Sequence, residues 1–190
     1  MNLKLILDNL TFQNIISSSD NELKKIREIR NEDNIRKNMR SKKIILIEEH
    51  LRWFNKIKLS KTNFFYVIRY KKNIVGGLGL NHYDKNTLFG EWSYYISGKT
   101  KFIGLGASIE YKAIEYFFNS YKLNRLFCYV LSHNSSVSKI HNKFGFEEIS
   151  FDEYIKHNNL EDKDPGGIYL SLKKSNWSYM NKKIYKKYFL

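Results

Sequence analysis

The sequence of 190 residues contains one cysteine, one proline and ten glycines. Because Cys128 is the only cysteine, a disulfide framework and a cysteine-rich zinc site are excluded, and a reducing compartment, the cytoplasm, is expected. No apolar run approaches the roughly 18 residues that a membrane-spanning helix needs. The segment MNLKLILDNLTF is interrupted by Lys4 and Asp8 and lacks a cleavage site of small residues, so no signal peptide is expected.

The scarcity of proline and the absence of Gly/Ser-rich or low-complexity tracts leave no place at which to divide the chain. Hydrophobic residues make up 42% and aromatic residues 16% of the sequence, which suffices for one core. We therefore expect a single domain over residues 1–172, followed by a basic, aromatic tail over residues 173–190. The five histidines show no ligand spacing, so no metal is expected.

The formal net charge of +14 is compatible with a nucleic-acid partner, a membrane surface or an anionic ligand. The lysines are spread over the whole length, which favours a compositional bias over a binding patch. The tail, KKSNWSYMNKKIYKKYFL, interleaves lysines with aromatic residues, a composition that suits RNA or an anionic surface. It would equally pack on the domain or on the second subunit of a homodimer.

Hydrophobic periodicity and turn residues predict alternating strands and helices. The leucines of Leu3–Leu7 alternate as in a strand, and Asp20 or Asn21 would cap a helix that ends at Arg30. The other expected elements are a helix over 47–58, strands over 64–70, 73–83 and 88–97, a helix over 109–121, a strand over 125–131, a helix over 137–144 and a strand over 168–174. This order indicates an α+β or α/β fold around a mixed sheet.

The stretch KFIGLGAS, residues 101–108, places Gly104 and Gly106 where a predicted strand leads into a predicted helix. Gly-rich turns of this kind let backbone N–H groups approach a phosphate, and the helix N-terminus adds partial positive charge. A P-loop needs Gly-Lys-Ser/Thr, which does not occur in the chain. A dinucleotide-binding fingerprint needs a third glycine at position 109, which is isoleucine.

A third kind of phosphate loop fits better. The pattern basic/Gln-x-x-Gly-x-Gly/Ala resembles the acetyl-CoA pyrophosphate loop of the GNAT superfamily of N-acetyltransferases. Here it reads Lys101-x-x-Gly104-x-Gly106, and it is followed by Asn134 after the next predicted strand and by Phe-Gly-Phe at 144–146. The order of the elements is also that of the family. The resemblance implies an acetyl-CoA-dependent N-acetyltransferase whose mostly antiparallel central sheet, flanked by helices, is splayed at its central strands.

For acetyl-CoA the resemblance implies two contact regions. The exposed edge of the splayed strand would pair with the pantetheine amides as an added strand does. Free N–H groups of the loop, with a basic side chain beside them, would hold the phosphates. The residues expected to bind acetyl-CoA are Tyr95, Ile96, Ser97, Lys101, Phe102, Ile103, Gly104, Leu105, Gly106, Ala107 and Asn134.

A second resemblance concerns the acceptor. The short runs RN at 30–31, NM at 38–39 and EHL at 49–51 are similar to those of the N-acetyltransferases of the pseudaminic-acid pathway. This implies a small-molecule nucleotide sugar, acetylated on the 4-amino group of a UDP-linked dideoxy amino sugar by direct attack. Arginine suits a diphosphate, and tryptophan offers a stacking face for uracil. The residues expected to bind the acceptor are Arg30, Asn31, Arg36, Met39, His50 and Trp53.

Transfer to an amine needs a base, because the amine is largely ammonium near neutral pH. Glu91, in the strand that faces the loop, is the expected base; the alternative is a surface carboxylate at the strand edge. A backbone N–H near Tyr95 or Ile96 would stabilise the oxyanion. His141 stands where many members of the superfamily place a tyrosine, as a general acid or a contact to coenzyme A, although its spacing also suits a core histidine. Ser132 is a further polar candidate.

Two other functions remain open from the sequence. The same fold and loop would serve an enzyme that acetylates a protein N-terminus of ribosomal type, without any nucleotide. A protein that binds nucleic acid or an anionic surface through the tail is the alternative of a different class, and nucleic acid is not the expected partner. Cys128 is interpreted as a buried structural thiol, with an acyl-cysteine as the alternative. No role follows for Gly76-Gly77 or for residues 152–167.

Overall fold

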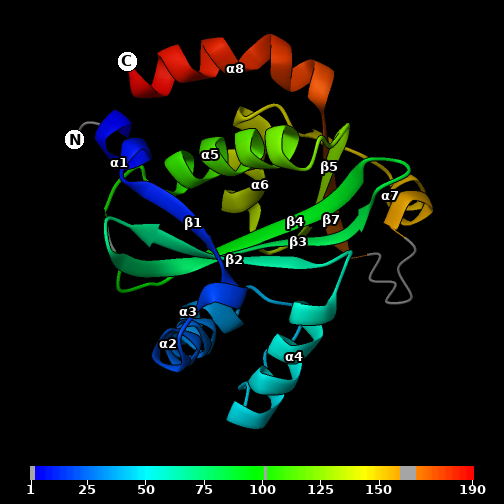
Figure 1. Ribbon diagram of the computed structural model, residues 1–190. Coiled ribbons are helices and arrows are strands. Elements are labelled where there is room, and N and C mark those ends of the chain that lie inside the picture. The colour runs from blue at the N-terminus through cyan, green and yellow to red at the C-terminus, as the bar shows by residue number, and fades with distance from the viewer. Residues whose placement is uncertain (1–2, 101, 159–165) are drawn as a thin grey trace.

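The structure is a computed structural model that describes residues 3–100, 102–158 and 166–190. Within these ranges the chain forms one sheet with helices on both faces (Figure 1). The strands are β1 (Leu10–Asn14), β2 (Phe64–Tyr70), β3 (Asn73–Asp84), β4 (Phe89–Ile96), β5 (Arg125–Leu131), β6 (Glu147–Glu148) and β7 (Gly167–Lys173). The helices are α1 (Leu3–Asp8), α2 (Asp20–Arg30), α3 (Asp33–Arg36), α4 (Ile47–Leu59), α5 (Leu105–Ser120), α6 (Ser135–Lys143), α7 (Phe151–Asn158) and α8 (Lys174–Phe189).

The strands of the described ranges lie in the order β1-β2-β3-β4-β5-β7-β6. Neighbouring strands are antiparallel except β4 and β5, which run parallel. The ladder between β4 and β5 ends at the pair Glu91–Phe127, and beyond it the two strands separate. The expected fold class, a mixed and mostly antiparallel sheet that is flanked by helices and splayed at its centre, is confirmed.

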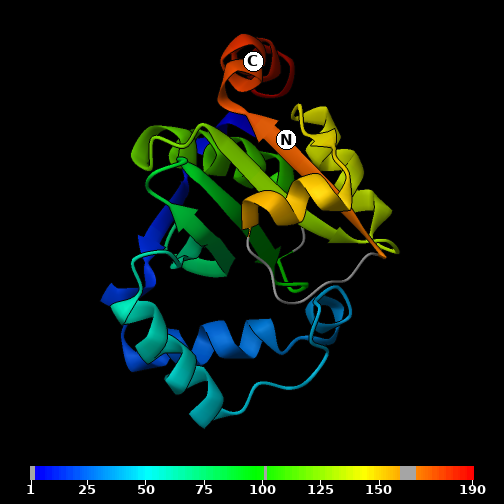
Figure 2. The ribbon, with the colours of Figure 1, turned by 90° about the vertical axis from the view of Figure 1, so that its right-hand side faces the viewer.

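Helices cover the two faces of the sheet unequally (Figures 1 and 2). On one face α5 lies next to the sheet and α8 lies outside α5, whereas α2, α3 and α4 lie on the other face. The largest cluster of buried side chains, which includes Trp92 and Phe117, lies between the sheet and α5. A second cluster around Ile26 and Val67 lies under α2, and a third includes Tyr154 of α7. No helix in the described ranges is long and apolar enough to cross a membrane.

Local sequence accounts for the start of α2. The Ser19 hydroxyl accepts a hydrogen bond from the Glu22 backbone N–H at 3.4 Å, and the Glu22 carboxylate accepts one from the Ser19 N–H at 2.8 Å. This capping box satisfies two N–H groups that a helix leaves unpaired. The predicted helix is confirmed, with Ser19 rather than Asp20 or Asn21 as its cap.

The strand expected over Leu3–Leu7 is wrong, because this segment forms α1 and the first strand begins at Leu10. Ile6 and Leu7 are adjacent in the sequence and both buried, whereas Leu5 is 56% exposed, so burial does not alternate. The helix packs against α5 and α8. With only six residues in α1, its apolar pattern fits both a period of two and a helical period.

The other predicted elements are present with shifted ends. The helix expected over 109–121 begins at Leu105, and the helix expected over 137–144 begins at Ser135. The short elements α3 and β6, and the helix α7, were not predicted. The α7 helix occupies part of the segment 152–167 for which the sequence indicated no role.

The tail packs on the domain as α8. Trp177 and Ile184 are buried and belong to the same cluster as Trp92. The Trp177 ring lies 5.4 Å from the ring of Tyr111 in α5, and its indole N–H donates to the Glu115 carboxylate of the same helix. The aromatic residues of the tail therefore cover α5, one of the two arrangements that the sequence left open.

Trp177→Ala is expected to destabilise the protein by about 3–5 kcal/mol, because truncating a buried aromatic ring leaves a cavity. Tyr179 on the same helix is 88% exposed, so Tyr179→Ala should change the free energy of unfolding by less than about 0.5 kcal/mol. Urea unfolding followed by circular dichroism measures both variants. Equally small effects would show that α8 contributes little to the core.

Candidate functional site

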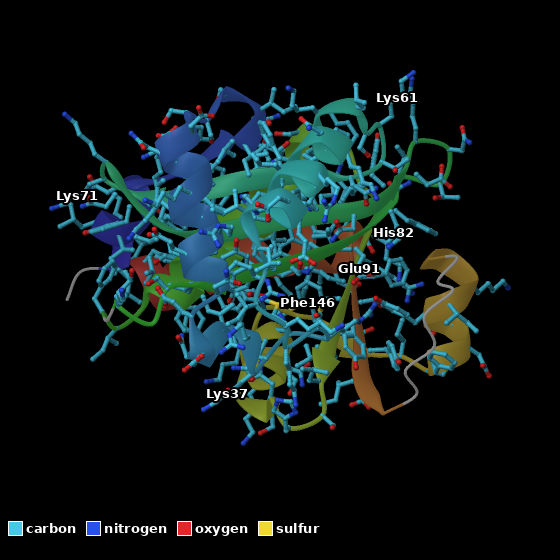
Figure 3. All side chains as sticks on the ribbon, turned by 90° about the horizontal axis from the view of Figure 1, so that it is seen from below. Lys37, Lys61, Lys71, His82, Glu91 and Phe146 are labelled. Atoms are coloured by element: carbon cyan, nitrogen blue, oxygen red, sulfur yellow. The ribbon has the colours of Figure 1, made fainter. Side chains whose placement is uncertain are left out.

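The separation of β4 from β5 opens a cavity of about 620 Å³ between the two strands. Its walls come from residues 91–96 of β4, residues 128–131 of β5, α6, the end of α2 and the segment around α3. Figure 3 shows Glu91 and Phe146 within the outline of the molecule, with Lys37 at its periphery. Of the residues expected at the site, the cavity is lined by Arg30, Met39, Glu91, Tyr95, Ile96, Gly106, Asn134 and His141.

The edge of β4 that faces the cavity has no neighbouring strand beyond Glu91 in the described ranges. The opposite edge of β4 remains paired with β3 as far as Ile96, which lies opposite Gly76. Backbone groups along Trp92–Ile96 therefore form an open sheet edge inside the cavity. An extended ligand with amide groups can pair with such an edge as an added strand would.

Glu32 fixes the turn that follows β4. Ser97 Oγ donates to Glu32 Oε1 at 2.7 Å, and the Gly98 backbone N–H donates to Glu32 Oε2 at 2.7 Å. A Cβ on Gly98 would lie 2.6 Å from Asn34 Nδ2, so the Asn34 side chain packs closely on this turn. The Ser97 side chain is buried against Glu32, outside the cavity lining, and its expected contact with coenzyme A stays a prediction.

The N-terminus of α5 opens on the cavity. Gly104, which precedes the helix, has a φ of +91°, and a Cβ there would lie 1.9 Å from Leu3 Cδ2. Gly106 lines the cavity, and the nearest heavy atom to a Cβ there would be Ile96 Cδ1, at 4.0 Å. Because first-turn N–H groups have no acceptor within a helix, this end of α5 presents donors and partial positive charge.

The other residues of the expected phosphate loop have mixed environments. Phe102 and Ala107 pack against the main core cluster, and Leu105 is buried within it. Ile103 is 87% exposed. Lys101 lies outside the described residues. Among the described residues 102–107, Gly106 alone lines the cavity, so this part of the loop would contact a ligand mainly through its backbone.

Gly76 and Gly77 make room for Tyr95. A Cβ on Gly76 would lie 2.0 Å from the Tyr95 carbonyl oxygen, and a Cβ on Gly77 would lie 2.8 Å from the Tyr95 hydroxyl. The tyrosine therefore packs directly on the bare backbone of β3. Burial raises the pKa of Tyr95 although Arg30 opposes this, so the hydroxyl is neutral. These glycines, which had no role in the sequence analysis, shape the cavity wall.

Glu91 lies where the sheet divides. It is the last residue of β4 that pairs with β5, and on its other side it pairs with Asn81 of β3. Its Oε2 is buried, and the Tyr154 hydroxyl of α7 lies close enough to the carboxylate to form a hydrogen bond with it. Burial, together with the Glu91 carboxylate, raises the pKa of the Tyr154 hydroxyl, which places α7 next to this carboxylate. A carboxylate in this position can take a proton from a ligand in the cavity.

His141 contacts a carboxylate that the sequence analysis did not identify. Its Nδ1 lies 2.6 Å from Glu110 Oε1, and the two residues are 4% and 0% exposed. Burial lowers the pKa of His141, but the Glu110 carboxylate, aided by a hydrogen bond between the ring and the neutral Cys128 thiol, outweighs burial and holds the pKa well above its usual range. His141 is thus both buried in the core and part of the cavity wall.

A sequence signal for Glu110 existed. It precedes Ala113 by three and Ile114 by four positions, so it shares their face of α5, and that face is buried. A carboxylate on an otherwise apolar helix face needs a partner, because burying an unpaired charge is costly. The inward-facing His141 of the next helix was the available partner.

Arg30 reaches the cavity from the end of α2. Its Nη2 lies 3.4 Å from the Ser41 carbonyl oxygen, whereas Nη1 is buried and lacks a partner within the described ranges. Burial lowers the pKa of the guanidinium, an effect that a bound anion would oppose. Met39 and Arg40 follow α3, and the Arg40 guanidinium lies 4.2 Å above the Tyr129 ring of β5. This segment therefore crosses the opening from the β4 side to the β5 side.

Asn31 and Arg36 shape that segment and do not line the cavity. The Asn31 amide donates to the Ile45 carbonyl at 2.9 Å and accepts from the Ile45 N–H at 2.8 Å. Arg36 donates to the carbonyl oxygens of Asn31 at 3.1 Å and Lys42 at 2.9 Å. Both side chains are engaged with backbone, so any effect on an acceptor is indirect.

The remaining candidates fall into two groups. His50 and Trp53 stack at 5.1 Å, and Trp53 packs edge-on against Phe65 in the cluster under α2. Neither lines the cavity, and their expected contact with the acceptor stays a prediction. Ser132 is exposed after β5 and is also outside the lining, whereas Asn134, at the start of α6, is part of it.

The model of the acetyltransferase (GNAT) domain family matches residues 15–162. The chain therefore belongs to the GNAT acetyltransferases, as the phosphate-loop resemblance implied, and it is an acyltransferase with acetyl-CoA as its cosubstrate. No curated protein sequence matches the chain.

Two solved structures illustrate the likeness in fold. The N-acetyltransferase PseH of Campylobacter jejuni has a TM-score of 0.66 and 21% identity, over 87% of this chain and 99% of its own. PseH is also known in complex with acetyl coenzyme A. The spermidine N-acetyltransferase of Vibrio cholerae, in complex with CoA and spermine, has a TM-score of 0.75 and 16% identity, over 90% of this chain and 99% of its own.

Gly106→Ala is expected to weaken acetyl-CoA binding at least about tenfold, or about 1.4 kcal/mol, because the added methyl group lies in the cavity. The fold should tolerate it, with the free energy of unfolding unchanged or raised by up to about 1 kcal/mol, since alanine favours a helix. Gly104→Ala should instead destabilise the protein, because a left-handed residue costs about 1–2 kcal/mol before the clash with Leu3 is counted. Isothermal titration calorimetry and thermal unfolding measure both effects. Unchanged affinity in folded Gly106→Ala protein would show that acetyl-CoA does not approach this end of α5.

Proposed function

We propose that the protein transfers acetyl from acetyl-CoA to the 4-amino group of a UDP-linked amino sugar of the 4-amino-4,6-dideoxy-N-acetyl-β-L-altrosamine type. The step would serve the cytoplasmic synthesis of pseudaminic acid or a related surface-glycan sugar. The runs at 30–31, 38–39 and 49–51 that resemble enzymes of that pathway support this acceptor. Direct attack in a ternary complex is part of the proposal.

The charge of the cavity wall is the observation that carries the proposal. Arg30 and Arg40 line it, and Glu91 is the single carboxylate among the described lining residues. A buried guanidinium with a free N–H suits the diphosphate of a nucleotide sugar. A polyamine, which the similar Vibrio cholerae enzyme binds, would be repelled by these arginines. We therefore favour an anionic acceptor over spermidine.

Each catalytic role follows from a position around the cavity. Glu91 accepts the proton of the attacking amine, directly or through a water. A backbone N–H near Tyr95 or Ile96, on the open edge of β4, stabilises the oxyanion of the tetrahedral intermediate. His141 stands on the α6 side and donates a proton to the departing thiolate. Asn134 contacts the pantetheine at the start of α6.

The acceptor side is more limited than the sequence implied. Arg30 and Met39 contact the acceptor in this proposal, while Asn31 and Arg36 act by holding the segment that carries Met39. A homo-oligomer is also part of the proposal, supported by the dodecameric structure of the similar spermidine N-acetyltransferase.

The acceptor is tested by measuring thiol release from acetyl-CoA with four additions: the UDP-amino sugar, spermidine, peptides with free N-termini, and none. Release only with the nucleotide sugar is expected. In the same assay Arg30→Gln should raise the KM for the sugar at least about tenfold, because one charged hydrogen bond is worth about 1.5–3 kcal/mol. Arg52→Gln, at an exposed position of α4, is the matched control and should leave the KM unchanged.

Release with spermidine or peptides but not with the sugar would contradict the acceptor and leave the acetyl-CoA site intact. If Arg30→Gln and Arg52→Gln changed the KM for the sugar equally, Arg30 would have no specific role in binding the acceptor. Absence of release with all four additions would leave the assignment of the acceptor without support.

Glu91→Gln should lower kcat by about 100-fold or more, because the amide cannot accept the proton. The substitution preserves size, so the affinity for acetyl-CoA, measured by calorimetry, should stay within about twofold. A kcat close to that of the unmodified protein would remove Glu91 as the base.

A further inference from the structure

A buried pair of ionisable side chains stands in the wall of the cavity. Glu110 of α5 is 0% exposed and its Oε1 lies 2.6 Å from His141 Nδ1 of α6. Burying a carboxylate is costly even when it is paired, and an apolar residue at this position would fill the same space without that cost. The pair borders the cavity through His141. Its location suggests a chemical role and not only a packing role.

The other groups around the imidazole are mostly neutral. Trp92 lies edge-on to the ring with centroids 5.5 Å apart, and the Phe146 ring lies at 5.2 Å. Tyr94 of β4 and Cys128 of β5 also face it or its carboxylate. Burial raises the pKa of both the tyrosine and the thiol, so neither is ionised near neutral pH. The lysines of α6 are exposed to solvent.

Glu110 is therefore the charged group that governs the protonation of this imidazole. The contact through Nδ1 fixes the ring orientation and leaves Nε2 as the other N–H of an imidazolium. The Cys128 thiol of β5, which also lines the cavity, is a further hydrogen-bond neighbour of the ring. In the superfamily resemblance this position is a tyrosine, which is a neutral and weaker acid. Here a charged imidazolium would stand in place of a neutral tyrosine as the donor of the same proton.

We propose that Glu110 is a positioning residue that keeps His141 as an imidazolium, so that its Nε2–H is the acid that protonates the leaving thiolate of coenzyme A. This inference rests on the proposed role of His141 but is independent of which amine is the acceptor. The carboxylate itself does not touch the substrate.

In the proposed acetyl transfer, each proton and the electron pair that move have an acceptor. The amine nitrogen forms a bond to the acetyl carbonyl carbon, and the bond from that carbon to sulfur breaks with its electron pair on sulfur. The sulfur takes the Nε2 proton, and His141 becomes neutral while its Nδ1–H remains on Glu110. The proton lost by the amine passes to Glu91. Solvent then restores the imidazolium.

Removing the Glu110 carboxylate is expected to lower the pH at which His141 loses its proton. With Glu110 present the pKa of His141 is raised, so the acid is charged through neutral pH and is lost only as pH rises through that raised value. In Glu110→Gln the carboxylate is absent and burial remains, which lowers the pKa of the imidazole. The variant therefore loses its acid at a lower pH than the unmodified protein.

The test is the pH profile of kcat for Glu110→Gln. The descending limb is expected to move down by at least about one pH unit, and kcat at pH 8 to fall roughly 10- to 100-fold. The ascending limb, set by the amine and Glu91, should stay in place. Glu115→Gln is the matched control on the same helix, since Glu115 accepts from Trp177 and not from His141, and its descending limb should not move. A descending limb that is the same in all three proteins would overturn the proposal.

A merely structural role is separated by a double-mutant cycle. In a His141→Asn background, Glu110→Gln should cause no further loss of kcat, because its effect passes through the missing imidazole. A second, additive loss would show that Glu110 acts independently of His141 and contradict the proposal.

A titration of the imidazole without any acceptor keeps this inference distinct from the choice of substrate. The ring resonances of the five histidines can be followed by NMR, with His141→Asn identifying the resonance of His141. We expect its midpoint well above 6.5 in the unmodified protein and below 6.5 in Glu110→Gln. An unshifted midpoint would refute the proposal even if the nucleotide sugar is the acceptor. Acetylation of Cys128 by acetyl-CoA alone would also refute it, because His141 would then serve as a base for a cysteine nucleophile.

Discussion

The parting of β4 and β5 is the constraint on which the rest of the site depends. Two parallel strands normally satisfy each other's backbone groups, and here the ladder ends after Glu91. Trp92 and residues of α6 line the cavity between the separated strands. Buried backbone groups without partners cost about 1–3 kcal/mol each. A ligand with amide groups can therefore satisfy the unpaired backbone groups of β4. The cavity lies where these groups are unpaired.

Glycines adapt the remainder of the chain to this opening. Gly104 takes a left-handed conformation so that α5 can start at the cavity, with Leu3 of α1 against its backbone. Gly76 and Gly77 carry no side chain where the backbone carbonyl and the ring end of Tyr95 approach β3. In a chain with only ten glycines, these positions concentrate around one site because close backbone approach is needed there.

The fold was largely predictable because its long elements have clear periods and its phosphate loop has a distinctive glycine spacing. The strand expected over Leu3–Leu7 failed because so short a segment fits either period. The left-handed conformation of Gly104 was predictable because it follows from local sequence, and Arg30, Glu91 and His141 of the expected residues line the cavity. Glu110 escaped notice because its partner is 31 residues away, and contacts of that kind depend on tertiary packing. His50 resembled a ligand-binding residue in sequence but packs with Trp53 in the core under α2.

The stacking of Trp92 has a spectroscopic consequence. Trp92 is a cavity-lining residue whose ring stacks on Phe146 at 5.8 Å, whereas Trp53 packs on the cluster under α2 and Trp177 of α8 packs against α5. The indole beside the opening therefore reports on whatever occupies it. Its emission should respond to occupancy without an added label, and binding at the opening can be observed optically before any turnover.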